Sequence, residues 1–199
     1  MVKIILVRHA ETDWNQVRRI QGGGSNTPLN ERGLRQAESL AQRLQTEGLQ
    51  AIYSSPLERA LVTARAIAGY HKLEVAVEPS LREIEAGELE GVTVAEIGKH
   101  FSQILTAGGQ GEPWPRIPGG ESLPEVRERA WRTIQRLVTK HPEGMLAVVS
   151  HYFVILTIIC SVLDLPLSHI GRFRLGTGSI SVVEFSDQVA RLLVFNESC

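Results

Sequence analysis

Two short apolar runs in this chain each end in a histidine, and together they restrict the possible folds more than any other feature. Residues 2–7 precede Arg8-His9, and residues 145–150 precede His151. Runs of this length and composition are typical of strands buried in a sheet. Because ligands of open α/β sheets bind outside the carboxyl ends of the strands, we expect His9 and His151 to face one pocket.

The rest of the chain alternates between helix-like and strand-like patterns. Apolar residues spaced along one face predict helices over 31–47, 55–69 and 122–140, one from 153 onward, and a short one beginning at Thr93. The expected N-caps are Asn30, Ser55 and Ser122. Further strands are predicted at 51–53, 74–78, 179–185 and 189–195. This order predicts an α/β fold, a three-layer sandwich with a mostly parallel central sheet (one antiparallel edge strand) flanked by helices.

Length and composition indicate one soluble domain over residues 1–199. The chain has 21 basic and 22 acidic side chains and two cysteines, Cys160 and Cys199, so no disulfide framework or basic surface for nucleic acid is expected. The apolar stretch 153–163 is shorter than the ~20 residues of a membrane span. We expect no signal peptide, no membrane partner and a cytoplasmic location.

A loop rich in proline and glycine occupies residues 108–120. It is longer than most connections between elements, and long loops are often active-site lids. We therefore expect a lid within 84–121.

Arg8 and His9 together can handle a phosphoryl group. A neutral imidazole can attack phosphorus, and a guanidinium beside it neutralises the oxygens of the transferred group. The alternative is a salt-bridged Arg8 and a histidine that merely ends a strand.

Arg59 follows Ser54–Pro56 in the first turn of a predicted helix. A cation at the positive end of the helix dipole costs about 0.3–1 kcal/mol unless an anion compensates it. The position therefore favours a phosphate-binding arginine. The alternative is a solvated helix arginine.

Residues 81–91 contain carboxylates at Glu83, Glu85, Glu88 and Glu90. A carboxyl group with a raised pKa can protonate a leaving oxygen and then activate water. The local sequence does not show which of these glutamates acts, and a solvated acidic loop is the alternative.

His151 has two possible roles. Its imidazole can stabilise phosphoryl oxygens, or it can be a histidine of the core or a helix cap.

Ordered motifs along nearly the whole chain resemble those of the histidine phosphatase superfamily, in the branch of cofactor-dependent phosphoglycerate mutases and small bacterial phosphatases. The similar segments are Leu6–Thr12, Trp14-Asn15, Arg19, Gln21-Gly22, Pro28-Leu29, Gly33, Gln36-Ala37, Ser54–Leu57, Arg59-Ala60, Thr63-Ala64, Leu81–Gly91, Pro118–Ser122 and Val148–His151.

The resemblance implies roles for individual residues. His9 corresponds to the nucleophile and Glu83 to the proton donor, and the phosphoryl clamp consists of Arg8, Arg59 and His151. The implied further substrate contacts are Asn15, Gln21, Gly22 and Tyr152. The resemblance implies no metal and no cofactor, since the arginines supply the positive charge that Mg²⁺ would bring.

Three positions depart from the family pattern. Ala10 replaces a usual glycine, and Asn26 lies where an aspartate is frequent. Tyr152-Phe153 replaces small residues after the second histidine, so two aromatic rings are expected to narrow the site or to offer a stacking wall. We expect Ala10 to be tolerated and Asn26 to have little catalytic effect, whereas the choice of substrate is expected to depend on Tyr152-Phe153 and on the lid near Trp114.

The sequence favours hydrolysis of a small phosphorylated metabolite through a phosphohistidine. The stretch between Gly91 and Glu121 is short and the chain stops soon after its last strand, whereas mutases of this family are longer. Phosphoglycerate mutase activity is the alternative, followed by a silent domain that binds phosphorylated ligands and by a metal-dependent hydrolase. The resemblance also allows a homodimer, and the sequence does not identify the phosphomonoester.

Overall fold

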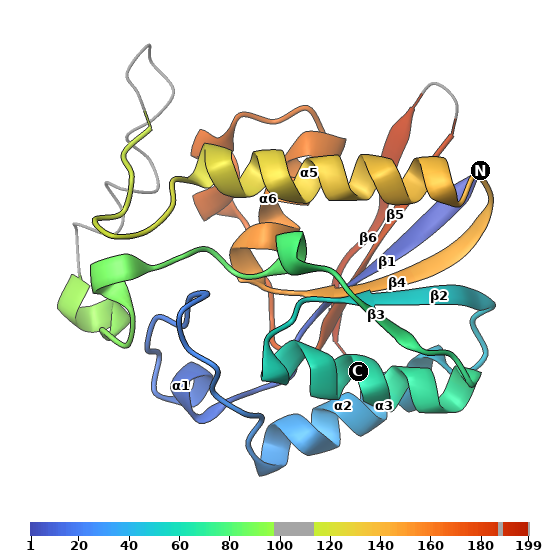
Figure 1. The fold of residues 1–199 in the computed structure, drawn as a ribbon, viewed down its shortest axis with the longest axis horizontal. Coiled ribbons are helices and arrows are strands. Elements are labelled where there is room, and N and C mark those ends of the chain that lie inside the picture. The colour runs from blue at the N-terminus through green and yellow to red at the C-terminus, as the bar shows by residue number, and fades with distance from the viewer. Residues whose placement is uncertain (98–113, 187–188, 199) are drawn as a thin grey trace.

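A six-stranded sheet forms the centre of the computed structural model, which describes residues 1–97, 114–186 and 189–198 (Figure 1). The strands are β1 Val2–Arg8, β2 Leu49–Ser54, β3 Val75–Val77, β4 Gly144–Ser150, β5 Ser179–Phe185 and β6 Ala190–Ser198. In the order β3-β2-β4-β1-β5-β6, the first four strands pair in parallel, and β5 is antiparallel to both of its neighbours. The mostly parallel sheet with an antiparallel edge is confirmed, and a two-strand hairpin forms that edge.

Helices cover both faces of this sheet, which gives the expected three layers (Figure 1). The longer helices are α2 Glu31–Leu44 and α3 Glu58–His71 on one face, and α5 Leu123–Lys140 and α6 Tyr152–Val162 on the other. Residues of β1 alternate between the faces, so that Ile5 and Val7 pack with α2 and α3, and Ile4 and Leu6 with α5 and α6. Burial on both faces explains why the strand sequences are continuous apolar runs.

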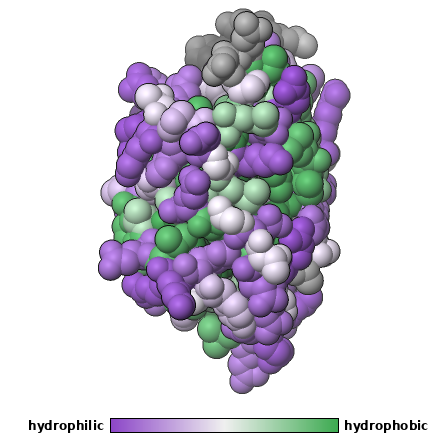
Figure 2. Space-filling model, turned by 90° about the vertical axis from the view of Figure 1, so that its right-hand side faces the viewer, coloured by the Kyte–Doolittle hydropathy of each residue, from purple (hydrophilic) through white to green (hydrophobic). Residues whose placement is uncertain are grey.

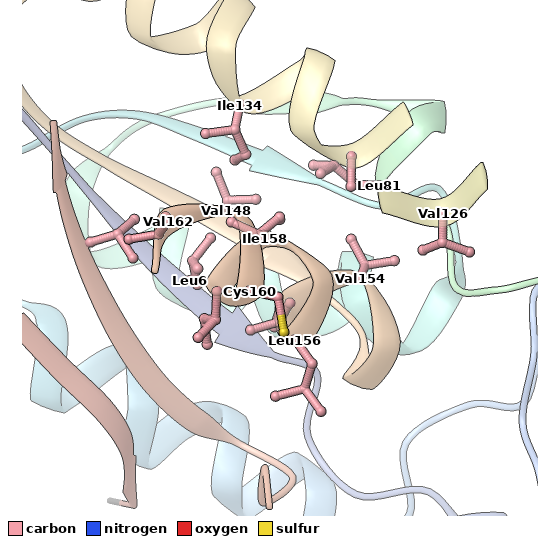
Figure 3. Close-up of a cluster of buried hydrophobic side chains, with 14 of the residues drawn as sticks. Leu6, Leu81, Val126, Ile134, Val148, Val154, Leu156, Ile158, Cys160 and Val162 are labelled. Carbon is pink, nitrogen blue, oxygen red and sulfur yellow. The ribbon is translucent and has the colours of Figure 1, made fainter. Parts of the chain in front are cut away.

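The larger core lies between the sheet, α5 and α6 (Figure 3). Leu6 and Val148 come from the strands, Ile134 from α5, and Val154 and Ile158 from α6. Helix α6 is apolar nearly all round because most of its side chains are buried. Among the described residues, no helix has both the length and the apolar character needed to cross a membrane.

The helix starts agree with the sequence except at α3. Asn30 caps α2 by accepting a hydrogen bond from the Gly33 amide at 2.8 Å, and Ser122 forms a capping box with Glu125 at α5. Thr93 caps the helical residues 94–97, and the residues that follow, 98–113, lie outside the described ranges. The prediction of Ser55 as N-cap was wrong, because α3 begins at Glu58 with Leu57 as its N-cap.

Four short elements were not predicted: α1 Asp13–Gln16, η1 Pro79–Leu81, η2 Gly87–Leu89 and η3 Leu167–Arg172. The expected lid at 84–121 is only partly described, since residues 98–113 lie outside the described ranges. Of the loop predicted at 108–120, the structure describes only residues 114–120.

The two ends of the parallel strands lie on opposite sides of the molecule (Figure 1). Figure 2 views the molecule from the side on which the N-terminus lies in Figure 1, where β1 begins, and most side chains there are hydrophilic, with hydrophobic ones in separate groups. The carboxyl ends of β1, β2 and β4 lie at the other end of the sheet. The polar residues singled out in the sequence follow these carboxyl ends.

Candidate active site

The two histidines meet because β1 and β4 are neighbouring parallel strands in register. Arg8 pairs with Ser150, and the amide of His9 donates to the Ser150 carbonyl at 3.0 Å, so His9 and His151 leave the sheet at the same level. Their ring centroids are 5.1 Å apart with an interplanar angle of 54°, and both residues are buried. The structure thus brings the two imidazoles together as the strand pattern predicted.

A backbone carbonyl sets the protonation of the His9 ring. Nδ1 lies 2.7 Å from the carbonyl oxygen of Ala10, which can only accept a hydrogen bond. The neutral ring therefore carries its proton on Nδ1 and an unshared electron pair on Nε2. Burial, and then the positive charges of Arg59 and Arg8, hold the pKa of His9 well below its usual value of 6.5. His9 is therefore a neutral imidazole at physiological pH.

His151 is held by a residue at the end of β2. Its Nε2 lies 2.7 Å from the hydroxyl oxygen of Ser55, and the backbone amide of Ser55 donates a hydrogen bond to the Val149 carbonyl at 3.0 Å. Its Nδ1 is buried and has no hydrogen-bond partner in the described part of the chain. Burial, followed by the charges of Arg59 and of neighbouring groups, lowers the pKa of His151 well below 6.5.

Arg59 is a fully buried cation at the start of α3. It donates to the carbonyls of Ser25 at 2.9 Å and Gly22 at 3.0 Å, while its buried Nε has no partner among the described residues. Burial lowers its pKa to about 10, which leaves the guanidinium charged at neutral pH. The sequence argument for Arg59 depended on this position in the first helical turn, and the structure confirms the position.

Arg8 brings the second cation to the carboxyl end of β1. Its Nη1 donates to the Leu175 carbonyl, and its guanidinium lies 5.0 Å from the ring centroid of Tyr152. A guanidinium over an aromatic face is favourable, by about 0.5–1 kcal/mol or more when desolvated. Its Nε is buried and unpaired within the described ranges. The ring of Tyr152 therefore packs against the guanidinium of Arg8.

Glu83 is the buried carboxyl group of the acidic loop. Its two oxygens accept hydrogen bonds from the amides of Ile84 at 2.9 Å and Phe153 at 3.2 Å. Burial raises its pKa above the usual 4.5, against the opposing effects of these amides and of the nearby cations. Of the four glutamates, Glu83 alone is buried, which provides the distinction that the local sequence did not.

The other predicted substrate contacts, Gln21, Gly22 and Asn15, form hydrogen bonds within the protein. The Gly22 carbonyl accepts from Arg59, and the Gln21 side chain accepts from the Thr12 hydroxyl at 3.0 Å. The buried Nε2 of Gln21 has no partner within the described ranges. Asn15 completes the capping box of α1 with Thr12.

Ser55 and Thr63 have positions in the site that the residue patterns did not reveal. Thr63 accepts from the Ala10 amide at 3.1 Å and donates to the Arg59 carbonyl at 2.7 Å, which joins the nucleophile loop to α3. Both residues lie in segments that carried the family resemblance, and that resemblance was the only signal for them.

No group of three or more His, Cys, Asp or Glu side chains in the described residues is arranged to hold a metal ion. The positive charge at this site comes from Arg8 and Arg59, which affect the pKa values of both His9 and Glu83.

Comparison with known proteins gives consistent matches over nearly the full length. The chain is 36% identical over 199 residues to "Phosphoserine phosphatase 1" of Hydrogenobacter thermophilus, covering 100% of this chain and 94% of that protein. It is 35% identical over 187 residues to a "Probable phosphoglycerate mutase GpmB" of Proteus mirabilis, covering 94% and 86% of the two chains.

Solved structures of phosphatases also match this chain over nearly its full length. A mutant phosphoserine phosphatase of Entamoeba histolytica in complex with phosphoserine matches with a TM-score of 0.88 and 32% identity, covering 99% of this chain and 98% of that one. A mycobacterial glucosyl-3-phosphoglycerate phosphatase with VO3 matches with a TM-score of 0.87 and 29% identity, covering 98% and 99%. The family model of the histidine phosphatase superfamily (branch 1) matches residues 4–198, and the chain belongs to that superfamily.

Proposed function

We propose that this phosphomonoester hydrolase uses His9 as a nucleophile and forms a phosphohistidine. The observation that carries the proposal is the 2.7 Å contact between His9 Nδ1 and the Ala10 carbonyl, which leaves the electron pair on Nε2. Nε2 attacks phosphorus, a new N–P bond forms, and the bond between phosphorus and the ester oxygen breaks. The alcohol leaves with a proton from Glu83.

The clamp on the phosphoryl group consists of Arg8, Arg59 and His151. Arg8 Nε, Arg59 Nε and His151 Nδ1 are buried without partners among the described residues, and they supply directional hydrogen bonds for phosphoryl oxygens. The two guanidinium groups are positively charged, while the imidazoles and the protonated Glu83 are neutral. The positive charge of the site therefore balances the charge of a phosphate dianion. Gln21 Nε2, which is also without a partner in the part of the chain that the structure describes, is a further donor.

Glu83 serves both halves of the reaction. After protonating the leaving alcohol, its carboxylate accepts a proton from water, whose oxygen attacks the phosphorus of phosphohistidine. The N–P bond breaks, inorganic phosphate leaves, and neutral His9 and protonated Glu83 are restored. A carboxyl group with a raised pKa is suited to this alternation.

For the substrate, we propose a small phosphorylated metabolite. Relatives of the chain are named for phosphoserine and for glucosyl-3-phosphoglycerate, and another solved neighbour holds 3-phosphoglyceric acid. The aromatic pair Tyr152 and Phe153, with ring centroids 5.2 Å apart, lies beside Arg8 and Glu83, and these contacts support a role in selecting the alcohol part of the substrate. A single domain over 1–199, a lid within 84–121, a cytoplasmic location, a metal-free reaction and a homodimer remain proposals from the sequence.

Mutase activity is the second candidate, because relatives at 35% identity are named probable phosphoglycerate mutases. Incubation of 3-phosphoglycerate with and without 2,3-bisphosphoglycerate separates the two activities. We expect release of inorganic phosphate and no cofactor-dependent formation of 2-phosphoglycerate.

The phosphohistidine is tested by rapid quenching in alkali after mixing with radiolabelled 4-nitrophenyl phosphate. The expected result is label on a peptide containing His9 in the wild type and none in His9→Ala. Turnover by His9→Ala at the wild-type rate would overturn the proposal.

A further inference from the structure

Arg129 of α5 lies beside the loop that carries Glu83, and each of its N–H groups has an acceptor. Nε and Nη2 donate to the carboxylate of Glu121, both at 2.9 Å. Nη1 donates to the carbonyls of Ser80 at 2.8 Å and Arg82 at 2.6 Å, and Nη2 also donates to the Glu83 carbonyl at 3.2 Å. A guanidinium has five donors in a planar fork, so this arrangement uses all of them.

The backbone that leads to Glu83 is therefore held by hydrogen bonds to each carbonyl of residues 80–83. Besides the three carbonyls held by Arg129, the carbonyl of Leu81 accepts from the Ser150 hydroxyl at 2.7 Å. Ser150 directly precedes His151. The loop of the proton donor is therefore tied both to α5 and to the end of β4.

Glu121 holds the same loop on the other side of Glu83. Its carboxylate accepts from the Glu85 amide at 3.0 Å, and its own amide donates to the Glu85 carbonyl at 2.9 Å. This approach needs a glycine next to Glu121, since a Cβ on Gly120 would lie 2.1 Å from the Glu85 carbonyl oxygen. The side chain of Arg129 is only 22% exposed, whereas Arg132 and Arg136, which form other ion pairs of α5, are 76% and 55% exposed.

We propose that Arg129, held by Glu121, is a positioning residue that aims the Glu83 carboxyl group at the leaving oxygen of the substrate. The inference rests on the proposed function, because it assumes that Glu83 donates the proton. Arg129 holds the backbone carbonyls of residues 80, 82 and 83, so it acts through Glu83. Displacement of a catalytic group by about 1 Å can cost on the order of 100-fold in rate.

Two kinds of ester distinguish positioning of the acid from general support of the fold. An alkyl phosphate has a poor leaving group that needs the proton, whereas 4-nitrophenolate leaves readily without it. We expect Arg129→Met to lower kcat/KM at least 10-fold more for the best alkyl phosphate among phosphoserine, 3-phosphoglycerate and glycerol phosphate than for 4-nitrophenyl phosphate. Arg129→Lys keeps the charge but not the planar fork, and should show a smaller difference in the same direction.

Arg136→Met is the matched control. Arg136 lies on the same helix and forms an ion pair with Glu78, just before η1, without holding the carbonyls of 80–83. It should change both rates less than 2-fold. Should Arg129→Met fail to fold, Glu121→Gln is measured instead, with the same difference expected.

Equal losses on both esters in a folded Arg129 or Glu121 variant would overturn the inference, and so would unchanged rates on both. Failure of the proposed function has another signature, since wild-type enzyme would then hydrolyse neither ester, or His9→Ala would remain active on both.

Discussion

The ring of His9 is oriented by the carbonyl oxygen of Ala10, the next residue in the chain, at 2.7 Å from Nδ1. The contact assigns the proton and the electron pair of the neutral ring without the participation of a carboxylate. The usual glycine at position 10 is replaced by alanine, and the backbone carbonyl still makes this contact.

Replacement of the nucleophile should abolish turnover. We expect His9→Ala to lower kcat at least about 1,000-fold on every phosphomonoester, because the remaining donors bind phosphate but cannot form the covalent intermediate. Steady-state release of phosphate measures the loss. His71→Ala, on α3 outside the site, is the control and should retain wild-type turnover; a His9→Ala rate within 10-fold of wild type would contradict the assignment.

Glu83→Gln should remove one limb of the pH profile. Burial raises the pKa of Glu83 and lowers that of His9, so the active form has a protonated carboxyl and a neutral imidazole. The rate should fall in acid as His9 gains a proton and in alkali as Glu83 loses one. We expect Glu83→Gln to lose about 100- to 10,000-fold on alkyl phosphates and to lack the alkaline limb.

The measurement is kcat/KM against pH from 4.5 to 9. Glu85→Gln is the matched control, since Glu85 is in the same loop and its side chain is 42% exposed. An alkaline limb that persists unchanged in Glu83→Gln would assign that limb to another group.

Local patterns predicted the sheet and the pairing of the two histidines. An apolar run six residues long is a local signal of a buried strand, and the parallel register of β1 and β4 then places His9 beside His151. The start of α3 was predicted wrongly for a reason outside its own sequence. The Ser55 hydroxyl, which local rules assign to an N-cap, lies 2.7 Å from His151 Nε2 and also accepts a hydrogen bond from the Leu57 amide at 3.3 Å, just before α3 begins.

Contacts between residues far apart in the sequence explain the parts of the site that local sequence patterns could not predict. Glu83 differs from Glu85 and Glu88 by its burial against α6, which the loop sequence alone does not contain. Arg129 looks in sequence like any charged residue on an amphipathic helix. Its contacts with residues 80–83 become visible only when α5 is packed over the sheet.

Orthovanadate should bind the clamp and stabilise the folded enzyme. It resembles the five-coordinate phosphoryl group, and a ligand at 100 times its Kd raises the free energy of unfolding by about 2.7 kcal/mol. Arg59→Met removes one guanidinium and should abolish most of the resulting rise in Tm, whereas Arg65→Met on the same helix should keep it. Thermal scans with and without millimolar vanadate decide this, and an equal rise in wild type and Arg59→Met would contradict a role for Arg59 in the clamp.

Activity should not depend on a divalent ion, because Arg8 and Arg59 supply the charge opposite the phosphoryl oxygens. We expect enzyme dialysed against EDTA to keep its kcat, and added Mg²⁺ or Zn²⁺ not to raise it. Phosphate release before and after dialysis is the measurement. Loss of activity that a divalent ion restores would favour the metal-dependent alternative.

Protein stability should fall as the pH drops below 6.5. Burial lowers the pKa of His9 and of His151, so the folded state binds fewer protons at these rings than the unfolded chain does. The free energy of unfolding therefore decreases with falling pH, by up to about 1.4 kcal/mol per pH unit for each ring. The raised pKa of Glu83 acts oppositely, since its contribution is lost as pH rises above 4.5.

Comparison of variants isolates the histidine contribution, because the carboxylates are common to all of them. We expect the urea midpoint of His151→Asn to decline less steeply than that of wild type between pH 7.5 and 5. His169→Asn, in η3, should follow the wild-type slope. Parallel slopes for wild type and His151→Asn would mean that His151 does not enter the folded protein as a neutral ring, and the clamp would then present an imidazolium to the phosphoryl group.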